Sequence, residues 1–485
     1  MYATLKFDTE DVYYPPEYRI DDIPGWLAEI MTDVGVRGTF IVFGEKARCL
    51  RERGRKDVLE KMAAHDIASH QMGNVRPLIP EILADKGWAD GVAAMRQYED
   101  RVAEELRAAF GCDPVALSRH NLYFGPQHVA VGGERGIPYV YGVTGVEGTE
   151  TPTWYAGTLN LPSSTTPDFA GFDEIYSCDD AFQTKMRQLD QFLAACGERG
   201  VEFVSIFGCH PIKVMARGWI EHYCLVGGLT RTPEQLGWRY GVKSRAEEAR
   251  AQANFRRLCE YLRDHPDLEV LGTAEAARLF STQPEDITCD ELLAYAGQLA
   301  ESGKVVLNRT FSPAELVTAL AESLANAGAD GRVPDAVPRR NVLGPTSRPI
   351  LGREADTLTH QELVDLCRQL LAAVHTDGHL PANVHTADNR VGIAQLAMAA
   401  GRGYAASARH EKHERIRVPE VPRCPDAAWP LDAFIQRQIG EHWAYALDFS
   451  VDKMAEQARL QTWTLKPAWL NPPRGRMICE GRVKA

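Results

Sequence analysis

The chain has 485 residues, of which 45% are hydrophobic and 25% charged, and its formal net charge is −12 at pH 7. This length exceeds one comfortable core, so we expect two or more globular domains. The negative charge argues against nucleic acid or an anionic membrane surface as a partner, and no apolar run approaches the ~20 residues of a membrane span. Eleven scattered cysteines without a CxxC pair, and no secretory leader before the first strand, predict a cytoplasmic protein with reduced thiols.

Residues 1–281 alternate short β-rich runs with amphipathic helical runs. This repetition predicts a parallel α/β domain with a barrel-like sheet, in which chemistry gathers where the strands end. The predicted strands are Ala3–Phe7, Gly38–Phe43, Asp66–Ala68, Val115–Leu117, Tyr139–Val143, Phe203–Phe207 and Leu268–Leu271. The predicted helices are Ile23–Val34, Asp57–Ala64, Gly91–Phe110, Gln183–Arg199 and Arg245–His265.

From residue 282 the sequence changes to Leu/Ala-rich helices, and an internal repeat with a period of 47 appears. The segment that begins at Phe311 recurs from Leu358, and a shorter copy begins at Ile287. Each copy predicts a capped helix, a glycine stop and an extended Pro-bearing segment. We therefore predict a helical repeat domain over residues 282–401.

Residues 402–485 are rich in Pro, Arg and Trp. They predict a C-terminal helical tail with two helices, near Leu431–Trp443 and Val451–Thr462.

The tetrapeptide Asp8-Thr9-Glu10-Asp11 ends the first predicted strand with three carboxylates in four residues. Such a cluster is costly to bury unless a cation lies among the carboxylates, and a metal ion is the first candidate. On a strand, Asp8 and Glu10 point to one face, and Asp11 emerges at the following turn. The alternative is that the three carboxylates are simply solvated at the strand end. Histidines placed near them would favour the metal site over this alternative.

Three later segments also follow predicted strands. His70 precedes Asn74 by four residues, which is a metal-ligand spacing on a helical turn, although an amide oxygen is a weak ligand. His210 is placed for proton transfer. Arg119 could orient a carboxylate, and His120 is a second candidate ligand or acid. Taken alone, each of these residues more often has a structural role. Because all of them follow predicted strands, we group them as one candidate site.

Together these segments resemble the polysaccharide deacetylase (NodB-homology) superfamily, the family 4 carbohydrate esterases, over roughly residues 1–280. A Gly-Trp-x-x-Gly-Val stretch at Gly87–Val92 is similar to one subgroup of it. The matching motifs are Phe7–Asp11, Gly35–Gly44, His65–Asn74, Ser118–Asn121 and Phe207–Pro211.

The resemblance implies a distorted (β/α) barrel and a divalent metal, with zinc the expected ion, held by one carboxylate and two histidines. It implies a hydrolase that removes acetyl groups from an amino sugar or polysaccharide. By position, Asp8 is the general base, Arg119 braces it, and His210 is the acid that protonates the leaving amine. The metal residues by position are Glu10 or Asp11 with His70 and Asn74.

The sequence departs from the family at Asn74, where the pattern has its second histidine, and at His120-Asn121, where it has a Pro-containing pair. An Asn ligand should hold zinc weakly, so His120 or an acid could complete the site. No Asp-containing motif stands out near Tyr139–Glu147. Two other functions stay open: a catalytically weakened carbohydrate-binding protein, and a C–N hydrolase of a small amide or cyclic ureide.

The repeats are similar to pseudomurein-binding repeats over residues 306–395. That similarity implies attachment to a cell-wall polysaccharide. The expected partners are thus an acetylated carbohydrate or small amide as substrate and a polysaccharide at the repeats, without nucleic acid or membrane. Whether the chain forms a homo-oligomer is left open.

Overall fold

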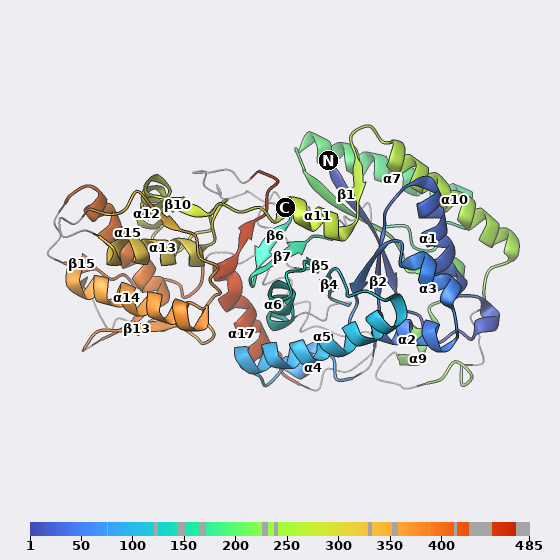
Figure 1. Ribbon diagram of the computed structural model, residues 1–485, viewed down its shortest axis with the longest axis horizontal. Coiled ribbons are helices and arrows are strands. Elements are labelled where there is room, and N and C mark those ends of the chain that lie inside the picture. Colours follow the sequence, from blue (N-terminus) through green and yellow to red (C-terminus); the bar gives the residue numbers. More distant parts are fainter. Residues whose placement is uncertain are drawn as a thin grey trace.

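The computed structural model describes residues 1–74, 76–120, 125–142, 151–163, 171–225, 231–236, 241–327, 332–351, 357–387, 389–411, 415–425 and 449–471. Within these ranges one curled sheet of ten strands dominates one half of the molecule (Figure 1). Its strands are β1 (Tyr2–Thr9), β2 (Thr39–Val42), β3 (Asp66–Ser69), β4 (Leu117–Ser118), β5 (Tyr139–Val140), β6 (Thr153–Tyr155), β7 (Thr158–Leu161), β8 (Phe203–Cys209), β9 (Glu269–Leu271) and β16 (Lys466–Pro467).

The strand order is β16-β6-β7-β5-β4-β3-β2-β1-β8, and β9 also pairs with β1. From β7 through β5 to β1, and on to β8 and β9, all pairs are parallel, whereas β6 and β16 pair in the antiparallel sense. The predicted mixed α/β fold with a barrel-like parallel sheet is therefore confirmed. Its consequence for function is that the carboxyl ends of β5, β4, β3, β2, β1 and β8 lie side by side.

Strand β1 is buried on both faces, which explains its mixed sequence. Leu5 and Phe7 belong to the main apolar core, where the Phe7 ring lies 5.8 Å from that of Phe255. Lys6 and Asp8 alternate with them and so point to the inner face of the curled sheet, where the Lys6 ammonium lies 4.2 Å from the ring of Tyr141. The polar residues of β1 thus line the interior instead of facing solvent.

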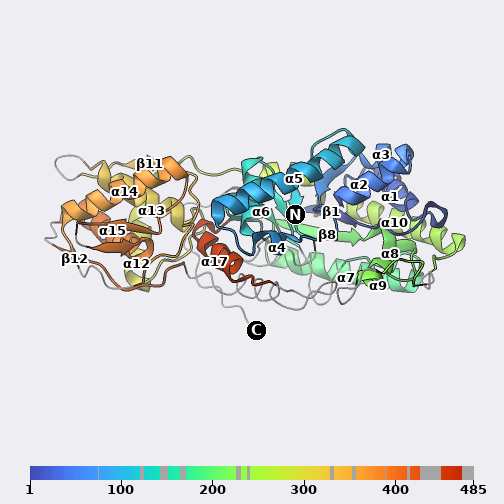
Figure 2. The ribbon, with the colours of Figure 1, turned by 90° about the horizontal axis from the view of Figure 1, so that it is seen from below.

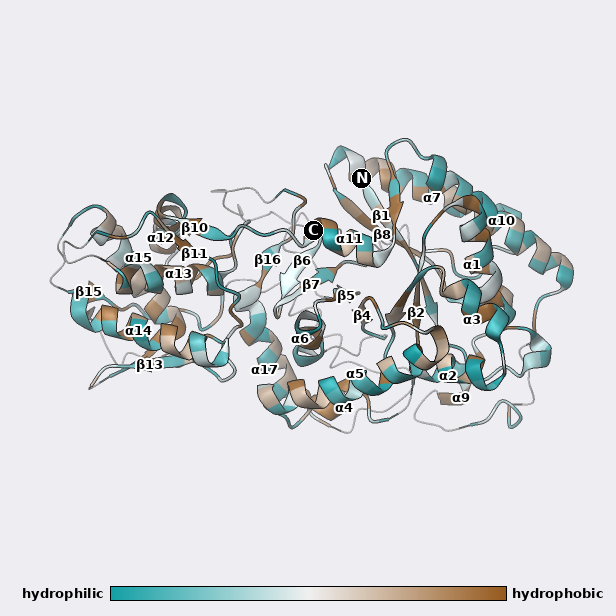
Figure 3. Cartoon of the chain, viewed as in Figure 1, coloured by the Kyte–Doolittle hydropathy of each residue, from teal (hydrophilic) through white to brown (hydrophobic). Residues whose placement is uncertain are grey.

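Helices pack around the outer side of the sheet, with α3 and α10 against α1, and α2 and α6 against α5. Figure 3 shows hydrophilic and hydrophobic residues alternating along α5 and α10, as expected for helices with one buried face. Within the described ranges, no helix is both long and apolar enough to cross a lipid bilayer. The helices of this half are α1 (Asp22–Val34), α2 (Gly44–Glu52), α3 (Lys56–Met62), α4 (Ile79–Leu83), α5 (Trp88–Phe110), α6 (Pro126–Glu134), α7 (Asp179–Glu198), α8 (Pro211–Met215), α9 (Ile220–Leu225), α10 (Arg245–Asp264) and α11 (Thr273–Phe280).

The repeat units fold as capped helices around a second apolar core. Each begins with a capping box, in which the side chains of Thr288 and Glu291, Ser312 and Glu315, or Thr359 and Glu362 bond reciprocally to the backbone. The helices are α12 (Cys289–Ser302), α13 (Pro313–Ala325), α14 (His360–Asp377) and α15 (Ile393–Ala408). Short strand pairs link them: β10 (Asp286–Thr288) with β11 (Ala336–Pro338), β12 (Thr357–Leu358) with β15 (Ile416–Arg417), and β13 (Asn383–His385) with β14 (Arg390–Gly392).

The predicted glycine stops are present at Gly303 and Gly378, which cap α12 and α14 in the left-handed conformation at φ 67° and 72°. The corresponding Gly331 lies outside the described residues. What the repeats bind stays a prediction.

The C-terminal segment returns to the junction of the two halves. Helix α17 (Asp452–Leu460) continues into a 3₁₀ turn (Gln461–Thr464) and β16, and both views place α17 between the repeat helices and α6 (Figures 1 and 2). Lys466 of β16 forms a buried ion pair with Glu315 of α13, with both Nζ–Oε distances at 2.8 Å. The helix predicted at Val451–Thr462 is thus present, whereas Leu431–Trp443 lies outside the described residues.

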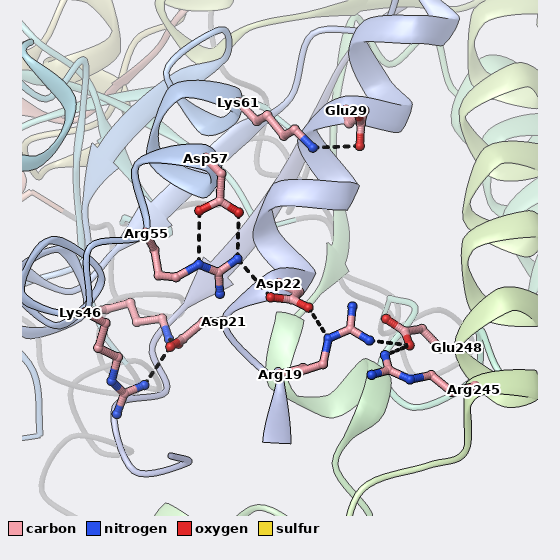
Figure 4. Close-up of polar contacts among 11 residues, drawn as sticks. Arg19, Asp21, Asp22, Glu29, Lys46, Arg55, Asp57, Lys61, Arg245 and Glu248 are labelled. Carbon is pink, nitrogen blue, oxygen red and sulfur yellow. Dashed lines mark hydrogen bonds and ion pairs between the residues drawn. The ribbon is translucent and has the colours of Figure 1, made fainter. Parts of the chain in front are cut away.

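A buried ion pair ties the start of α1 to α2, and it gives a stability prediction (Figure 4). Asp21 lies 2.6 Å from the ammonium of Lys46 and 2.7 Å from the guanidinium of Arg53, and the Asp21 and Lys46 side chains are only 1% and 3% exposed. Asp21→Asn leaves the Lys46 charge buried without its partner, so we expect the free energy of unfolding at pH 7 to fall by about 3–5 kcal/mol. Urea denaturation measures it.

The pH dependence of this effect has a definite sign. Burial alone would raise the pKa of Asp21, but Lys46 and Arg53 outweigh burial and lower it. The stabilisation is therefore present above the unfolded pKa of about 3.9 and is lost as the pH falls through the folded pKa. Glu29→Gln, in the exposed pair with Lys61, is the matched control and should cost less than about 1 kcal/mol. Equal effects of the two substitutions would contradict the prediction.

Candidate metal centre

Polar side chains gather where the parallel strands of the sheet end. Asp8 and Glu10 stand at the end of β1, and His70 directly follows β3. His120 lies two residues after β4, and His210 directly follows β8. Because these strands are neighbours in the sheet, residues up to 202 positions apart in sequence share one site.

The ligand-capable atoms form two overlapping groups, Glu10 with His70 and His120, and Asp8 with Glu10 and His210. Within each group these atoms lie within 4.8 Å of one another. Glu10 Oε1 is shared: it lies 2.8 Å from Nε2 of His70, 3.4 Å from Nε2 of His120 and 4.0 Å from Nε2 of His210. The arrangement offers one carboxylate and two imidazoles at its buried end, with Asp8 and His210 at the other.

The orientation of His70 is fixed by its second ring nitrogen. The hydroxyl of Ser118 donates its one proton to the carbonyl of Ser69 at 2.9 Å, so its oxygen accepts from Nδ1–H of His70 at 2.8 Å. Nε2 of His70 therefore faces the Glu10 carboxylate, and only a proton or a cation can lie favourably between them. This is the tautomer that a metal-ligating histidine needs.

The Phe43 ring packs against both histidines. The Phe43 ring, which directly follows β2, lies 5.2 Å from the ring of His70 and 4.8 Å from that of His120. Contacts of this kind hold both imidazoles in place and keep water from their sides, which strengthens electrostatic interactions at the site.

The two carboxylates have opposite pKa shifts. Without a metal, a proton lies between Nε2 of His70 and Glu10. Burial alone would raise the pKa of Glu10, but the charge of His120 and this hydrogen bond with His70 outweigh it and lower the pKa to about 2. Burial raises the pKa of Asp8, and the neighbouring histidines offset this only in part. The Tyr141 hydroxyl donates to Asp8 Oδ1 at 2.9 Å, which leaves Oδ2 toward His70 and His210, at 3.7 and 4.0 Å. Glu10 thus suits a ligand, and Asp8 a proton acceptor.

His210 is held by Asp173, which lies in the loop before α7. The Asp173 carboxylate accepts from the backbone N–H of His210 at 2.7 Å and from its Nδ1–H at 2.8 Å. Gly171 (φ 99°) lets this loop approach β8 closely, because a Cβ there would lie 2.8 Å from the carbonyl oxygen of Phe207. Burial alone would lower the pKa of His210, but Asp173, Glu10 and Asp8 raise it to about 9.

Removing the Asp173 charge should lower the pKa of His210. Asp173, Glu10 and Asp8 raise the pKa of His210 to about 9 in the wild type. With Asp173→Asn, we expect the His210 ring of the metal-free protein to titrate about 1–3 pH units lower than the wild-type ring. The charged form is then lost earlier as the pH rises. NMR titration of the imidazole measures this. Glu174→Gln, which alters the adjacent, 66% exposed side chain, is the control, and equal titration in all three proteins would refute the role of Asp173.

Two of the predicted metal residues, Asn74 and Asp11, lie outside both groups. The spacing of four residues predicts a ligand pair only on a helix, but residues 70–74 are not helical, and Gln71 has a φ of 71°. Asn74 instead donates through Nδ2 to Glu221 at 2.9 Å. Asp11 accepts a hydrogen bond from the backbone N–H of Tyr13 at 3.4 Å. Burial raises the pKa of Asp11, and the nearby charge of Lys46 offsets this only in part. The third residue of the group with Glu10 and His70 is His120, which the sequence left open as an alternative.

The remaining predicted residue is Arg119, which the sequence analysis expected to brace Asp8. Arg119 bonds to the backbone at the end of the neighbouring strand β5. Its Nε–H donates to the carbonyl of Tyr141, the residue whose hydroxyl contacts Asp8. Sequence reasoning missed Tyr141 and Asp173. Tyr141 has a weak signal, since it lies within the predicted strand Tyr139–Val143, whereas nothing in the sequence marks Asp173.

A cavity of about 900 Å³ lies away from this site. Pro114, Ile137 and Pro138, which precede β4 and β5, line it together with Leu343 and His379 of the repeat half. It therefore opens at the amino ends of the strands, between the two halves of the chain, and plays no part in the grouping above.

No protein family model matches the chain, and no curated protein does either. Among solved structures, it is similar to a Mycobacterium smegmatis protein named as a polysaccharide deacetylase, with 16% identity over 58% of this chain and 92% of that chain and a TM-score of 0.34. Puue allantoinase is 14% identical over 57% of this chain and 89% of that chain, with a TM-score of 0.35. A family 4 acetyl xylan esterase from Clostridium thermocellum, in complex with a cobalt ion, is 14% identical over 42% of this chain and 88% of that chain, with a TM-score of 0.24. With TM-scores this low, the fold rests on the strand order and the site on its distances.

Proposed function

We propose that the protein is a metal-dependent hydrolase that removes acetyl groups from an amino sugar or polysaccharide. The observation that carries this proposal is the group of Glu10, His70 and His120 beside Asp8 and His210. One carboxylate oxygen and two imidazole nitrogens suit zinc and leave positions open for water and substrate. The resemblance of the motifs to family 4 carbohydrate esterases supports acetyl transfer to water as the reaction.

The residues present fit a divalent ion. Glu10 is 2% exposed, and its Oε2 is buried without a hydrogen-bond partner among the described residues. A buried carboxylate oxygen of this kind is costly unless it meets a cation. The Nε2 atoms of His70 and His120 both face this carboxylate, so Glu10, His70 and His120 would hold the ion. When bound, it would supply Lewis-acid polarisation of the acetyl carbonyl and acidify water.

The other residues would move the protons. Asp8, held at Oδ1 by Tyr141, would accept a proton from the attacking water at Oδ2. His210 would donate the proton on Nε2 to the leaving amine as the C–N bond breaks, and Asp173 would stabilise the imidazolium before that transfer. Water thus adds across the amide, giving acetate and the free amine. The raised pKa of His210, about 9, supports a charged acid at neutral pH.

Acetate release from N-acetylated oligosaccharides by the zinc-loaded protein tests the proposal. We expect turnover by the wild type and its loss in the double variant Asp8→Ala, His70→Ala. Full activity in that variant would rule the proposal out. A parallel panel of small amides and cyclic ureides separates it from a small-molecule C–N hydrolase with the same site, and glycan binding without any turnover would favour a binding protein.

A further inference from the structure

Lys6 is a buried lysine on the inner face of the sheet that has no part in the chemistry above. It lies on β1, two residues before Asp8, and is only 1% exposed. Among the described residues, its ammonium has a single hydrogen-bond acceptor, the carbonyl of Pro162, at 3.4 Å. Burial lowers the pKa of Lys6 to about 7, although the charge of Asp8 opposes this shift. An ammonium with so few partners is costly to bury, so an uncharged side chain would suit the fold better, and the lysine points to a role in function.

The residue that Lys6 contacts, Tyr141, has a strained backbone. Tyr141 directly follows β5 at a φ of 60°, a left-handed conformation that is rare for a bulky side chain and persists only where the surroundings hold it. Arg119 holds its backbone, because the Nε–H of Arg119 donates to the carbonyl of Tyr141. The Lys6 ammonium lies on the face of its ring, 4.2 Å from the ring centre. Its hydroxyl donates to Asp8 Oδ1 at 2.9 Å. The backbone, the ring and the hydroxyl of Tyr141 are thus each fixed by a different neighbour.

We propose that Lys6 is a positioning residue for the hydrolysis: its cation–π contact holds the Tyr141 ring in the orientation that presents the hydroxyl to Asp8. This inference rests on the proposed hydrolase function. The hydrogen bond from Tyr141 occupies Oδ1 of Asp8 and leaves Oδ2 toward His70 and His210, at 3.7 and 4.0 Å. Without the cation the ring is free to turn, and Asp8 loses the contact that decides which of its oxygens faces the site. Lys6 thus acts through Tyr141 and does not touch the substrate.

Lys6→Met separates this role from a structural one, because the two roles predict opposite changes in stability. Methionine has a similar length and no charge, so the midpoint of urea denaturation should stay the same or rise. The kcat for acetate release should nevertheless fall about three- to tenfold, while KM and the zinc content stay unchanged. The assays are run at about pH 6, below the pKa of Lys6, so that the ammonium of the wild type is charged.

Two further variants complete the experiment. Lys466→Met is the matched control, since Lys466 is also a buried lysine of this sheet but lies at the other end of the strand order and pairs with Glu315. We expect it to lower the denaturation midpoint and to leave kcat within about twofold of wild type. The second variant combines Lys6→Met with Tyr141→Phe. Because Lys6 acts through the hydroxyl of Tyr141, kcat should fall by less than about twofold below that of Tyr141→Phe alone.

Three results would overturn the inference: an unchanged kcat in Lys6→Met, a full further loss of kcat in the combined variant, or a fall in kcat that only accompanies a loss of zinc or of stability. If the wild type hydrolyses no acetylated saccharide, the proposed function fails, and NMR of the metal-free protein then decides. The signal of the Tyr141 ring carbon that bears the hydroxyl is identified by its loss in Tyr141→Phe. A shift of this signal in Lys6→Met, with none in Lys466→Met, would support the positioning role. An unchanged signal in Lys6→Met would refute it.

Discussion

His120→Ala should deprive the protein of its metal and its activity together. Nε2 of His120 lies 3.4 Å from the shared oxygen of Glu10, so its loss leaves one carboxylate and one imidazole. Changes to residues that merely support ligands cost about 10–100-fold in metal affinity, and the loss of a ligand should exceed this range. Zinc titration with a competing chelator measures the affinity, and acetate release measures the activity.

Asn74→Ala is the matched comparison, since Asn74 is also buried and also follows a strand of this edge. We expect it to keep zinc affinity within a few-fold of wild type, because Asn74 bonds to Glu221. The reverse pattern, with metal lost in Asn74→Ala and kept in His120→Ala, would restore the ligand set expected from sequence spacing and contradict the site described above.

Asp8→Asn should abolish most of the turnover while the metal stays bound. The substitution preserves the shape of the side chain and can still pair with the Tyr141 hydroxyl, but an amide cannot accept the proton from water. Proton transfer by a positioned base contributes about 10²–10⁴-fold, so kcat should fall by that factor. Acetate release under saturating substrate gives kcat, and metal analysis of the same sample gives the zinc content.

Tyr141→Phe is the control for this second prediction. It removes the hydrogen bond to Asp8 Oδ1 but leaves the carboxylate as a base, so its effect on kcat should be clearly smaller than that of Asp8→Asn. If Asp8→Asn instead loses zinc in step with activity, Asp8 is a ligand, and the division of labour between Asp8 and Glu10 is wrong.

The sequence predicts the fold well where local patterns carry it. The first strand is recognisable because an apolar run ends abruptly in carboxylates. The repeat is recognisable because Glu315 and Glu362 close capping boxes at a fixed period, an interaction that spans only three residues. The sequence does not predict β6, β7 and β16, the three strands at one end of the sheet. β16 pairs with β6 from more than 300 residues away, and no local pattern encodes such a partner.

The site is predictable only in part, for the same physical reason. Asp8 lies near the end of a strand, Glu10, His70 and His210 follow strands, and parallel topology brings strand ends together. The choice between Asn74 and His120 depended on the backbone after His70, where Gln71 adopts a left-handed conformation instead of continuing a helix. Asp173 depends on a loop that approaches β8 at Gly171, a tertiary contact without a sequence signal.

The most direct test of the metal centre is anomalous diffraction at the zinc edge from crystals of the zinc-loaded protein. The geometry predicts one strong anomalous peak at the carboxyl ends of β1, β3 and β4, ligated by Glu10, His70 and His120. A peak ligated instead by Asn74 or Asp11, or no peak at this edge of the sheet, would contradict it.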